Sequence, residues 1–291
     1  MTGPMPASAS GTRLSVVHRT VFHYGTPVTD SLNTVHLEPR RFPYQKTLSS
    51  LVRVLPATRL RRFEDLFHNP THHFELLEPH SRLEIVSHLK VHNLSLAIPP
   101  DSLAATGGEY AETATRERIW PYLQESSRVS KSPDVWRQAV DVTAGLVPVF
   151  ERARAVMEWI HGGFVYQPGA TGVKAHVEES FALRRGVCQD FTHVMLAMCR
   201  AVGLPARYAS GYLYNGPLDS LVGAQASHAW CEVYLPGCGW IGFDPTNNTL
   251  ADERYVKVAV GRDYDDVAPV VGTYHGTGHC RLEVSVAVEK I

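Results

Sequence analysis

The sequence predicts an α+β protein with an all-β N-terminal region followed by a core of helices and antiparallel strands. Short runs of β-branched and aromatic residues alternate with turn residues over 14–95. Apolar residues then recur at helical spacing over 102–163 and again over 189–202. Alternating strand patterns follow between 206 and 243, so the second half places a helix directly before antiparallel strands.

Composition sets the broad class. The chain has 291 residues, of which 44% are hydrophobic, enough to build one large domain or two ordinary ones. A net charge of −1 argues against a nucleic-acid partner or an anionic membrane surface. No run of about 18 apolar residues occurs, so no membrane span is predicted. Five scattered cysteines, an odd number, favour a reducing compartment, and we expect a cytoplasmic protein.

The chain divides into four predicted parts. Residues 1–13 are rich in Ser, Ala, Gly and Pro without an apolar segment, which indicates a disordered end and not a signal peptide. Residues 14–97 form the N-terminal β domain, residues 98–270 the core, and residues 271–291 a C-terminal strand that could join either sheet. The C-terminal strand is predicted because apolar residues alternate over 282–288.

The N-terminal region is predicted to be a sandwich or open barrel, because its strands are short and separated by turn residues. Gly25, Thr26 and Pro27 are interpreted as a turn. We find no catalytic constellation in this region. The predicted strands are 14–24, 31–38, 48–55, 59–67, 73–77 and 83–91.

Helices begin after the linker 98–102, where Pro99-Pro100 cannot continue a strand. Ser132-Pro133 is a helix start with an N-cap serine and proline in the first turn. An apolar stripe over 149–160 predicts a helix that ends at Gly162-Gly163. A short helix is predicted at 179–185, and the next runs from Gln189 to Val202.

Cys188 stands at the start of that last helix, after Gly186-Val187. The helix dipole and the free N–H groups there favour the thiolate form of a cysteine. By itself, however, the pattern is better explained by a buried structural cysteine. His228 and Asp244, further along the chain, favour a catalytic role for Cys188 instead.

His228 begins the strand 228–235, and Asp244 ends the strand that follows it. The tight turn Pro236–Gly239 makes the two strands antiparallel neighbours, so both residues fall toward the same far end of the hairpin. A cysteine nucleophile needs a base beside it and a group that orients the base. Cys188, His228 and Asp244 are therefore predicted to form a catalytic triad, although Asp244 before Pro245 could instead only cap a turn.

Several segments, taken together and in this order, resemble the bacterial transglutaminase-like family. They are Gly186-Val-Cys-Gln-Asp-Phe-Thr-His193, Cys199-Arg-Ala-Val-Gly-Leu-Pro-Ala-Arg-Tyr208, Ser210-Gly-Tyr212, Ser227-His-Ala-Trp230, Gly239-Trp-Ile-Gly-Phe-Asp-Pro-Thr246 and Gly261-Arg-Asp-Tyr-Asp-Asp-Val-Ala-Pro269. The resemblance covers nearly the whole chain. It implies a papain-like core with an accompanying N-terminal β domain, with Cys188 as nucleophile, His228 as general base and acid, and Asp244 as its orienting group.

The resemblance implies acyl transfer from a peptide or protein amide through a thioester. Peptide hydrolysis, as in a cysteine protease, is the leading hypothesis, with protein-glutamine crosslinking and a non-catalytic binding module as alternatives. The crosslinking branch carries tryptophan directly after its nucleophile, where this chain has Gln189. Its animal members also use calcium, and the acidic pattern of a calcium loop is absent from this sequence. We therefore expect neither a cofactor nor a metal.

The oxyanion would be held by the backbone N–H of Cys188 and by a side-chain donor, for which Tyr166 and Gln189 are candidates. Tyr166 is equally compatible with an aromatic ring packed beside the cleft. Four further polar residues are interpreted as structural: Asp190, His193, Cys199 and Arg207. Cys231 and Cys238 lack the second pair that a zinc site would need.

Overall fold

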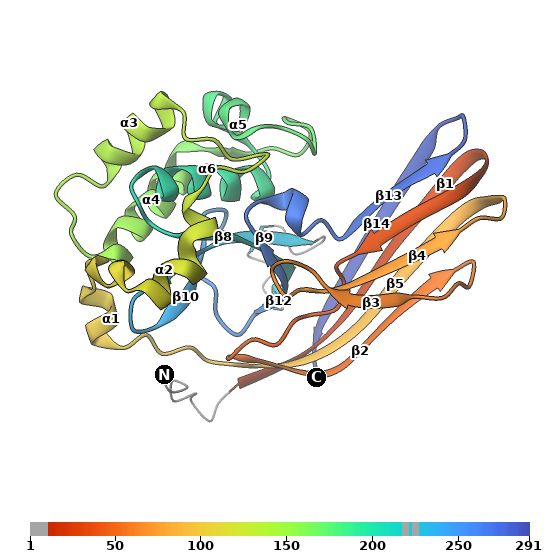
Figure 1. The fold of residues 1–291 in the computed structure, drawn as a ribbon, viewed down its shortest axis with the longest axis horizontal. Coiled ribbons are helices and arrows are strands. Elements are labelled where there is room, and N and C mark those ends of the chain that lie inside the picture. The colour runs from red at the N-terminus through yellow and green to blue at the C-terminus, as the bar shows by residue number, and fades with distance from the viewer. Residues whose placement is uncertain (1–10, 217–220, 223–226) are drawn as a thin grey trace.

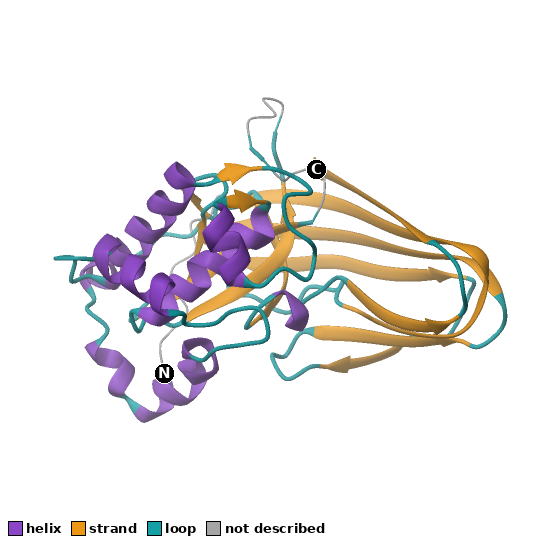
Figure 2. Ribbon diagram, turned by 90° about the horizontal axis from the view of Figure 1, so that it is seen from above, coloured by secondary structure: helices purple, strands orange, loops and turns teal. Residues whose placement is uncertain are grey.

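The computed structural model describes residues 11–216, 221–222 and 227–291 of the 291-residue chain. Of the end predicted to be disordered, 1–13, residues 1–10 lie outside the described part. The prediction is wrong for residues 11–13, which pair with the fifth strand at the start of the first one. A helical part and a β-rich wing make up the molecule (Figure 1). Strands of the wing fan away from the helices, which gather on the opposite side (Figure 2). The predicted α+β class is confirmed.

Five N-terminal strands form an antiparallel sheet in the order β2-β5-β1-β4-β3. The long strand β1 belongs to both halves of this sheet, since its first half pairs with β5 and its second half with β4. The halves curl toward one another over a hydrophobic cluster that includes Val35, Phe74 and Ile85. The strands are β1 (Gly11–Val35), β2 (Gln45–Leu55), β3 (Arg61–Glu64), β4 (Pro70–Leu76) and β5 (His80–Leu94).

The predicted turn at Gly25–Pro27 is wrong, because β1 runs through these residues as one strand. The backbone N–H of Gly25 donates to the carbonyl of His279 at 2.9 Å and stays in the sheet. The pairing with β5 shifts register between His23 and Val28, so Pro27 lies in an irregularity where a missing N–H is tolerated. Turn-forming residues therefore mark a bulge here and not a chain reversal.

The C-terminal tail forms two strands where the sequence predicted one, and both join the N-terminal sheet. Strand β13 (Val270–His275) pairs with the second half of β1, and β14 (Cys280–Lys290) pairs with the first half. Figure 1 shows these two strands of the chain end beside β1 of the chain start. The alternation over 282–288 thus identified a strand whose sheet only the fold could specify.

The core holds a second antiparallel sheet in the order β11-β10-β9-β8-β12, with helix α6 packed on β9 and β8. Its helices are α1 (Pro100–Ala104), α2 (Thr113–Ile119), α3 (Pro133–Val142), α4 (Val149–Gly163), α5 (Val177–Leu183) and α6 (Cys188–Ala201). The strands of that sheet are β8 (Ala206–Leu213), β9 (His228–Leu235), β10 (Gly239–Asp244), β11 (Thr249–Leu250) and β12 (Tyr255–Gly261), while β6 (Val165–Tyr166) and β7 (Arg185–Gly186) form a separate parallel pair. Short 3₁₀ helices lie at Gly108–Ala111, Trp120–Leu123 and Tyr264–Asp266.

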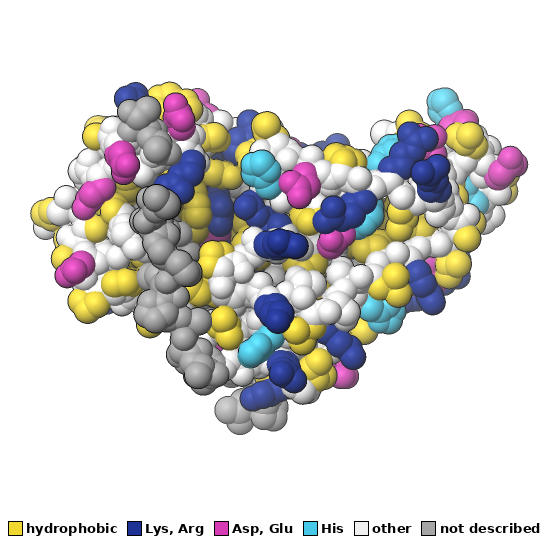
Figure 3. Space-filling model, turned by 60° about the horizontal axis from the view of Figure 1, so that its bottom comes forward, with side chains coloured by type: hydrophobic (Ala, Val, Ile, Leu, Met, Phe, Trp, Pro, Cys, Tyr) yellow, Lys and Arg dark blue, Asp and Glu magenta, His cyan; other side chains and the backbone are white. Residues whose placement is uncertain are grey.

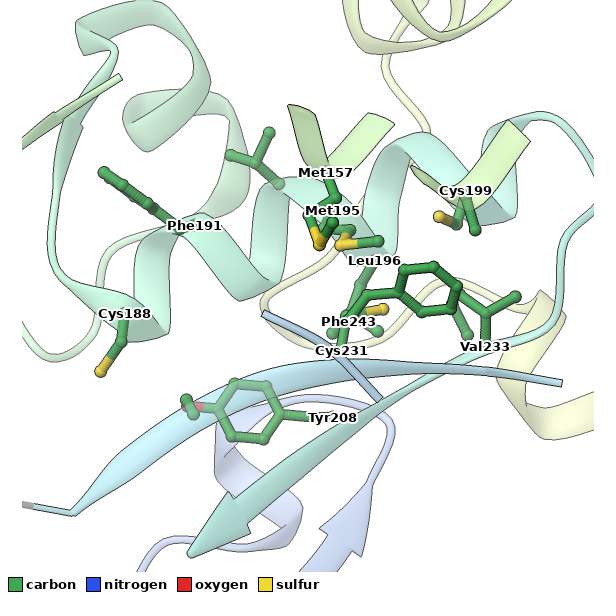
Figure 4. Packing of buried hydrophobic residues seen from close by; sticks show 14 of the residues in the cluster. Met157, Cys188, Phe191, Met195, Leu196, Cys199, Tyr208, Cys231, Val233 and Phe243 are labelled. Atoms are coloured by element: carbon green, nitrogen blue, oxygen red, sulfur yellow. The ribbon is translucent and has the colours of Figure 1, made fainter. Parts of the chain in front are cut away.

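Local sequence explains how the helices begin. The hydroxyl of Ser132 accepts a hydrogen bond from the N–H of Val135, and Pro133 occupies the first turn of α3, as predicted. Helix α6 is buried along almost its whole length, so it is the central element of the core. Figure 4 shows Met195 and Leu196 of α6 packed against Phe243 of β10, while Cys188 stands apart at the end of the helix.

The N-terminal sheet and the core share one hydrophobic interior. Leu14, Val16 and Val91 of the N-terminal sheet belong to the same buried cluster as α6 and the core strands. Buried polar contacts reinforce the junction: His18 Nδ1 lies 2.8 Å from the Tyr212 hydroxyl. The two regions are therefore consecutive in sequence but not independent in packing.

The molecular surface carries mixed charge. Lys and Arg side chains gather across the middle of the face shown in Figure 3, among acidic, histidine and apolar side chains. Among the described helices, none is both long and apolar enough to span a bilayer.

Asn69 gives a test of the shared interior. It is fully buried, its amide donates to the Val260 carbonyl at 2.8 Å and its oxygen accepts from the Val260 N–H at 3.0 Å. Replacing Asn69 by Ala leaves both backbone groups of Val260 without partners, so we expect the free energy of unfolding to fall by about 2–4 kcal/mol in urea titrations. The control Thr58→Ala removes an exposed hydrogen bond and should cost about 0.5 kcal/mol or less. Equal losses in the two variants would contradict a shared interior at this junction.

Candidate active site

Cys188 is the first residue of α6 and is 8% exposed. Its side chain lies at the positive end of the helix dipole, where the first N–H groups have no intrahelical acceptor. The Thr192 hydroxyl donates to the Cys188 carbonyl at 2.7 Å and ties down the first turn. The predicted placement of the thiol at a helix start is confirmed.

The turn before Cys188 is fixed by a buried carboxylate. Asp190 accepts from the Val187 N–H at 2.9 Å, from the Thr171 hydroxyl at 2.8 Å and from the Ser180 hydroxyl at 2.6 Å. Gly186 is required beside it, because a Cβ at that position would lie 2.6 Å from Asp190 Cβ. Asp190 is thus a helix-start anchor, as the sequence predicted, and it locks the orientation of the cysteine turn.

His228 and Asp244 meet across the β9–β10 hairpin. The register pairs Phe243 with Cys231, so the next residue, Asp244, comes opposite Trp230 and near His228 on the same face of β9. The Nε2 of His228 donates to Asp244 Oδ2 at 2.7 Å, and both side chains are fully buried. The fold thus brings together the pair that counting residues from the turn had predicted.

Asp244 accepts hydrogen bonds from five donors. Its Oδ1 accepts from the N–H groups of Thr246 at 2.9 Å and Asn247 at 3.3 Å. Its Oδ2 accepts, besides His228, the Tyr255 hydroxyl at 2.8 Å and the Asn247 amide at 2.8 Å. Asp244 therefore caps the turn after β10 and also binds the imidazole, two roles that the sequence had offered as alternatives.

Tyr255 and Asn247 were missed by the sequence analysis. Tyr255 begins β12, whose pairing with β8 brings its hydroxyl to the carboxylate. Asn247 lies in the turn after β10. An Asp-Pro-Thr-Asn turn was a possible signal for Asn247, because Asn commonly stabilises such turns. No local signal could have found Tyr255, since its contact depends on strand pairing.

Charge and burial determine the protonation of this pair. Burial lowers the pKa of His228, but the Asp244 carboxylate and the Cys188 sulfur raise it more, to about 10. Burial raises the pKa of Asp244, yet His228 and the hydrogen bonds from Asn247 and Tyr255 lower it below its ordinary value. The imidazole therefore carries its proton at neutral pH beside an ionised carboxylate.

The Cys188 sulfur lies near the imidazole, since it is among the groups that raise the pKa of His228. Nε2 of His228 is bonded to Asp244, and no hydrogen bond joins the buried Nδ1 to a nitrogen or oxygen of the described residues. Because the Cys188 sulfur contributes to the raised pKa of His228, Nδ1 is the ring nitrogen left to face the thiol. Cys188, the imidazole and the carboxylate thus follow one another in the order that a nucleophile, its base and an orienting group require.

Aromatic rings hold the imidazole from behind. Trp230 stacks on His228 with ring centroids 6.2 Å apart and an interplanar angle of 27°. The ring of Tyr255 lies 6.0 Å from that of His228 and 5.3 Å from that of Trp230. This packing restricts the rotation of the imidazole and excludes water from its inner face.

Of the two predicted oxyanion donors, Tyr166 is the one whose polar group makes no hydrogen bond with a described residue, and it lies near the thiol. Tyr166 pairs in register with Gly186, two residues before Cys188. Burial raises the pKa of Tyr166 to about 12, with the charges of Cys188, Asp190 and Asp244 acting in the same direction, so the hydroxyl keeps its proton. The side-chain amide of Gln189 instead donates to the Val173 carbonyl at 2.9 Å. Both roles stay predictions, but the geometry favours Tyr166.

The remaining polar residues are structural, as predicted. Burial lowers the pKa of His193 to about 4, and its Nε2 accepts from the Tyr264 N–H at 3.2 Å, so it is a neutral core histidine. Arg207 is bonded to Glu232 at 2.7 Å and lies 4.2 Å from the ring centroid of Trp240. Within the described part of the chain, no three His, Cys, Asp or Glu side chains converge as a metal site.

The raised pKa of His228 makes a prediction about stability. Its pKa in the folded protein lies above the ordinary 6.5, so the stabilisation is complete below about pH 6.5 and is lost as the pH rises toward 10. We expect the free energy of unfolding of the wild type to fall between pH 7 and pH 9.5 more steeply than that of His228→Gln, by up to about 1.4 kcal/mol per pH unit. Urea titrations at several pH values measure this, and the exposed-site control His275→Gln should keep the wild-type slope. Parallel curves for wild type and His228→Gln would contradict a charged imidazole in the folded protein.

Two family models match the chain. Residues 14–92 match the bacterial transglutaminase-like N-terminal region, and residues 137–245 match the transglutaminase-like superfamily. The second match contains Cys188, His228 and Asp244.

Relatives extend this likeness to nearly the full chain. An uncharacterized protein of Mycobacterium leprae is 34% identical over 282 residues, which cover 96% of this chain and 99% of the relative. A protein-glutamine gamma-glutamyltransferase of Pseudomonas aeruginosa is 35% identical over 109 residues, covering 35% of this chain and 16% of that protein. A crystal structure from Cytophaga hutchinsonii, described as a candidate cysteine protease, shares the fold with a TM-score of 0.81 and 21% identity, covering 97% of this chain and 92% of that one. With both family models matched in order, the chain belongs to the transglutaminase-like superfamily, in the bacterial branch that carries this N-terminal region.

Proposed function

We propose that the protein is a cysteine enzyme that attacks peptide or protein amides and releases the acyl group mainly to water. One observation carries the proposal: the buried His228–Asp244 pair, at 2.7 Å, lies beside the thiol at the start of α6. A charged imidazole next to a cysteine at a helix N-terminus holds the thiolate and stores the proton needed by a leaving amine.

The proposed reaction has two halves. The Cys188 thiolate attacks the amide carbonyl and forms a C–S bond, while the carbonyl oxygen gains the negative charge. The Cys188 N–H and the Tyr166 hydroxyl would stabilise that charge. His228 Nδ1–H then protonates the leaving nitrogen as the C–N bond breaks, which leaves a thioester and a neutral imidazole.

Water completes the cycle. The neutral imidazole takes a proton from water as the oxygen attacks the thioester, and the C–S bond breaks to release the acid and the thiolate. The imidazole is again charged, and Asp244 holds its orientation through Nε2 in both halves. A primary amine in place of water would give transfer instead of hydrolysis.

Crosslinking is the second candidate. The match to the Pseudomonas aeruginosa protein-glutamine gamma-glutamyltransferase favours it, although that match covers only 16% of the relative. Gln189 argues for hydrolysis, because it replaces the tryptophan that follows the nucleophile in the crosslinking branch. Its polar side chain is bonded to the Val173 carbonyl, so no aromatic ring shields the thioester at this position from water. A non-catalytic module is disfavoured because all three triad residue types are present.

The fate of the acyl group tests the proposal. We expect an internally quenched octapeptide library to be cleaved by the wild type and not by Cys188→Ala, with mass spectrometry showing free acids and little addition of monodansylcadaverine. Iodoacetamide at pH 6 should label Cys188 before the others, since burial raises the pKa of Cys280 above its ordinary value and that of Cys238 to about 11.

Cys280→Ser is the matched control for the labelling, because it removes the exposed thiol and should leave the labelling rate of Cys188 unchanged. Amine addition in excess of hydrolysis would replace the proposal by crosslinking. Equal labelling of Cys188 and Cys280 would argue against an activated thiol.

Tyr166 gives a separate prediction. Replacing Tyr166 by Phe keeps the ring that packs 6.2 Å from Phe191 but removes the hydroxyl, so kcat should fall by about 10²–10³ with little change in KM. Gln189→Ala is the control and should keep kcat within about threefold, because its amide already serves the Val173 carbonyl. Full activity in Tyr166→Phe would show that the ring only packs beside the cleft.

A further inference from the structure

A cavity of about 440 Å³ lies between the N-terminal sheet and the core. One wall comes from β1 and β13, including Asn33 and Val271, and the other from Val173, Lys174 and Tyr264 of the core. Its size falls in the range of pockets that hold small molecules or side chains. Both regions of the chain are needed to form it.

The cavity adjoins the catalytic thiol. Val173, on its wall, accepts a hydrogen bond from the side chain of Gln189, the residue after Cys188. Tyr264, on the same wall, has its pKa raised by burial, by Asp265 and by the charge of Cys188. A chain segment bound in the cavity would therefore lead directly to the nucleophile.

On this wall, one buried side-chain donor and one strand edge lack hydrogen-bond partners among the described residues. Asn33 is 4% exposed, and its amide nitrogen finds no hydrogen-bond acceptor in the part of the chain that the structure describes. Among the described strands, β13 pairs with β1 alone, so its other edge is open. A buried donor without an acceptor is costly, and an open strand edge is normally protected, so both features point to a ligand that completes them.

The surface around the opening is apolar and nearly neutral. Val173 is 66% exposed, Val271 50% and Tyr274 38%. The positive charge of Arg128 is neutralised by an ion pair between its Nε and Asp265 Oδ2 at 2.9 Å, while Lys174 makes no ion pair with a described residue. The ligand should therefore present apolar side chains and tolerate an acidic group better than a basic one.

We propose that this cavity binds the substrate as an extended peptide that adds a strand to the edge of β13. The six residues of β13 would pair with about 20 Å of extended chain. Apolar side chains of the peptide would fill the cavity, and a polar side chain of the peptide, reaching across β13, would accept from the Asn33 amide. The inference rests on the proposed function and gives the N-terminal region a role in selecting substrate.

Matched variants test it with the octapeptide library. Val271→Lys places a charge on the cavity wall, and Val284→Lys places the same charge on the neighbouring strand β14, at a similarly exposed site outside the cavity. We expect Val271→Lys to lower kcat/KM by about tenfold or more, mainly through KM, with Val284→Lys within about twofold of wild type. Asn33→Ala should lower kcat/KM by about three- to tenfold, and octapeptides with basic residues should be cleaved least.

Alkylation of Cys188 by iodoacetamide separates this inference from the proposed function, because so small a reagent does not need the cavity. All three variants should be alkylated at the wild-type rate. Wild-type cleavage by Val271→Lys and Asn33→Ala would overturn the inference and leave the proposed function intact. If the wild type cleaves no peptide, the proposed function fails. Amide hydrogen exchange of β13 is then measured in Cys188→Ala with and without the same library. Protection of the β13 amides by the library supports peptide binding, and unchanged exchange refutes it.

A second copy of the chain is the other occupant that an open edge could accept. Sedimentation of wild type and Val271→Lys distinguishes it. A dimer that Val271→Lys dissociates, with kcat/KM unchanged, would assign the edge to self-association and overturn the inference.

Discussion

The buried carboxylate of Asp244 is the group on which the rest of the site depends. Five donors surround it, and they come from three places in the fold: His228 on β9, the turn after β10, and Tyr255 on β12. An ionised carboxylate removed from water is stable only when its oxygens are satisfied in this way. The order of the core sheet is thereby coupled to the charge state of His228, the proposed catalytic base.

The N-terminal sheet supports this arrangement through β12. Asn93 donates to the Tyr255 carbonyl at 3.0 Å, Gln45 to the Lys257 carbonyl at 2.6 Å and Asn69 to the Val260 carbonyl at 2.8 Å. Each of these bonds fixes the strand whose first residue binds Asp244. The N-terminal region is therefore part of the scaffold of the site, and under the inference above it also forms one wall of the substrate cavity.

On the nucleophile side, a second buried carboxylate has a different task. Asp190 binds three donors around the turn of Gly186 and Val187, and none of them is His228. One acidic residue thus fixes the thiol and the other fixes the base. The chemistry between them needs both positions held rigidly, since a displacement of about 1 Å can cost two orders of magnitude in rate.

The sequence by itself determined the fold class, the family and the three residues of the proposed triad, because each depends on local pattern or on a tight turn that brings neighbours together. The helix start at Cys188 and the hairpin bearing His228 and Asp244 are local features, and counting residues from the turn was enough to pair them. Their catalytic roles remain predictions. Tertiary structure alone decided that β1 passes through Gly25–Pro27, that the tail adds two strands to the N-terminal sheet, and that Tyr255 completes the shell of Asp244. Those outcomes depend on pairing between residues far apart in sequence, for which a strand pattern predicts the existence of an edge but not its partner.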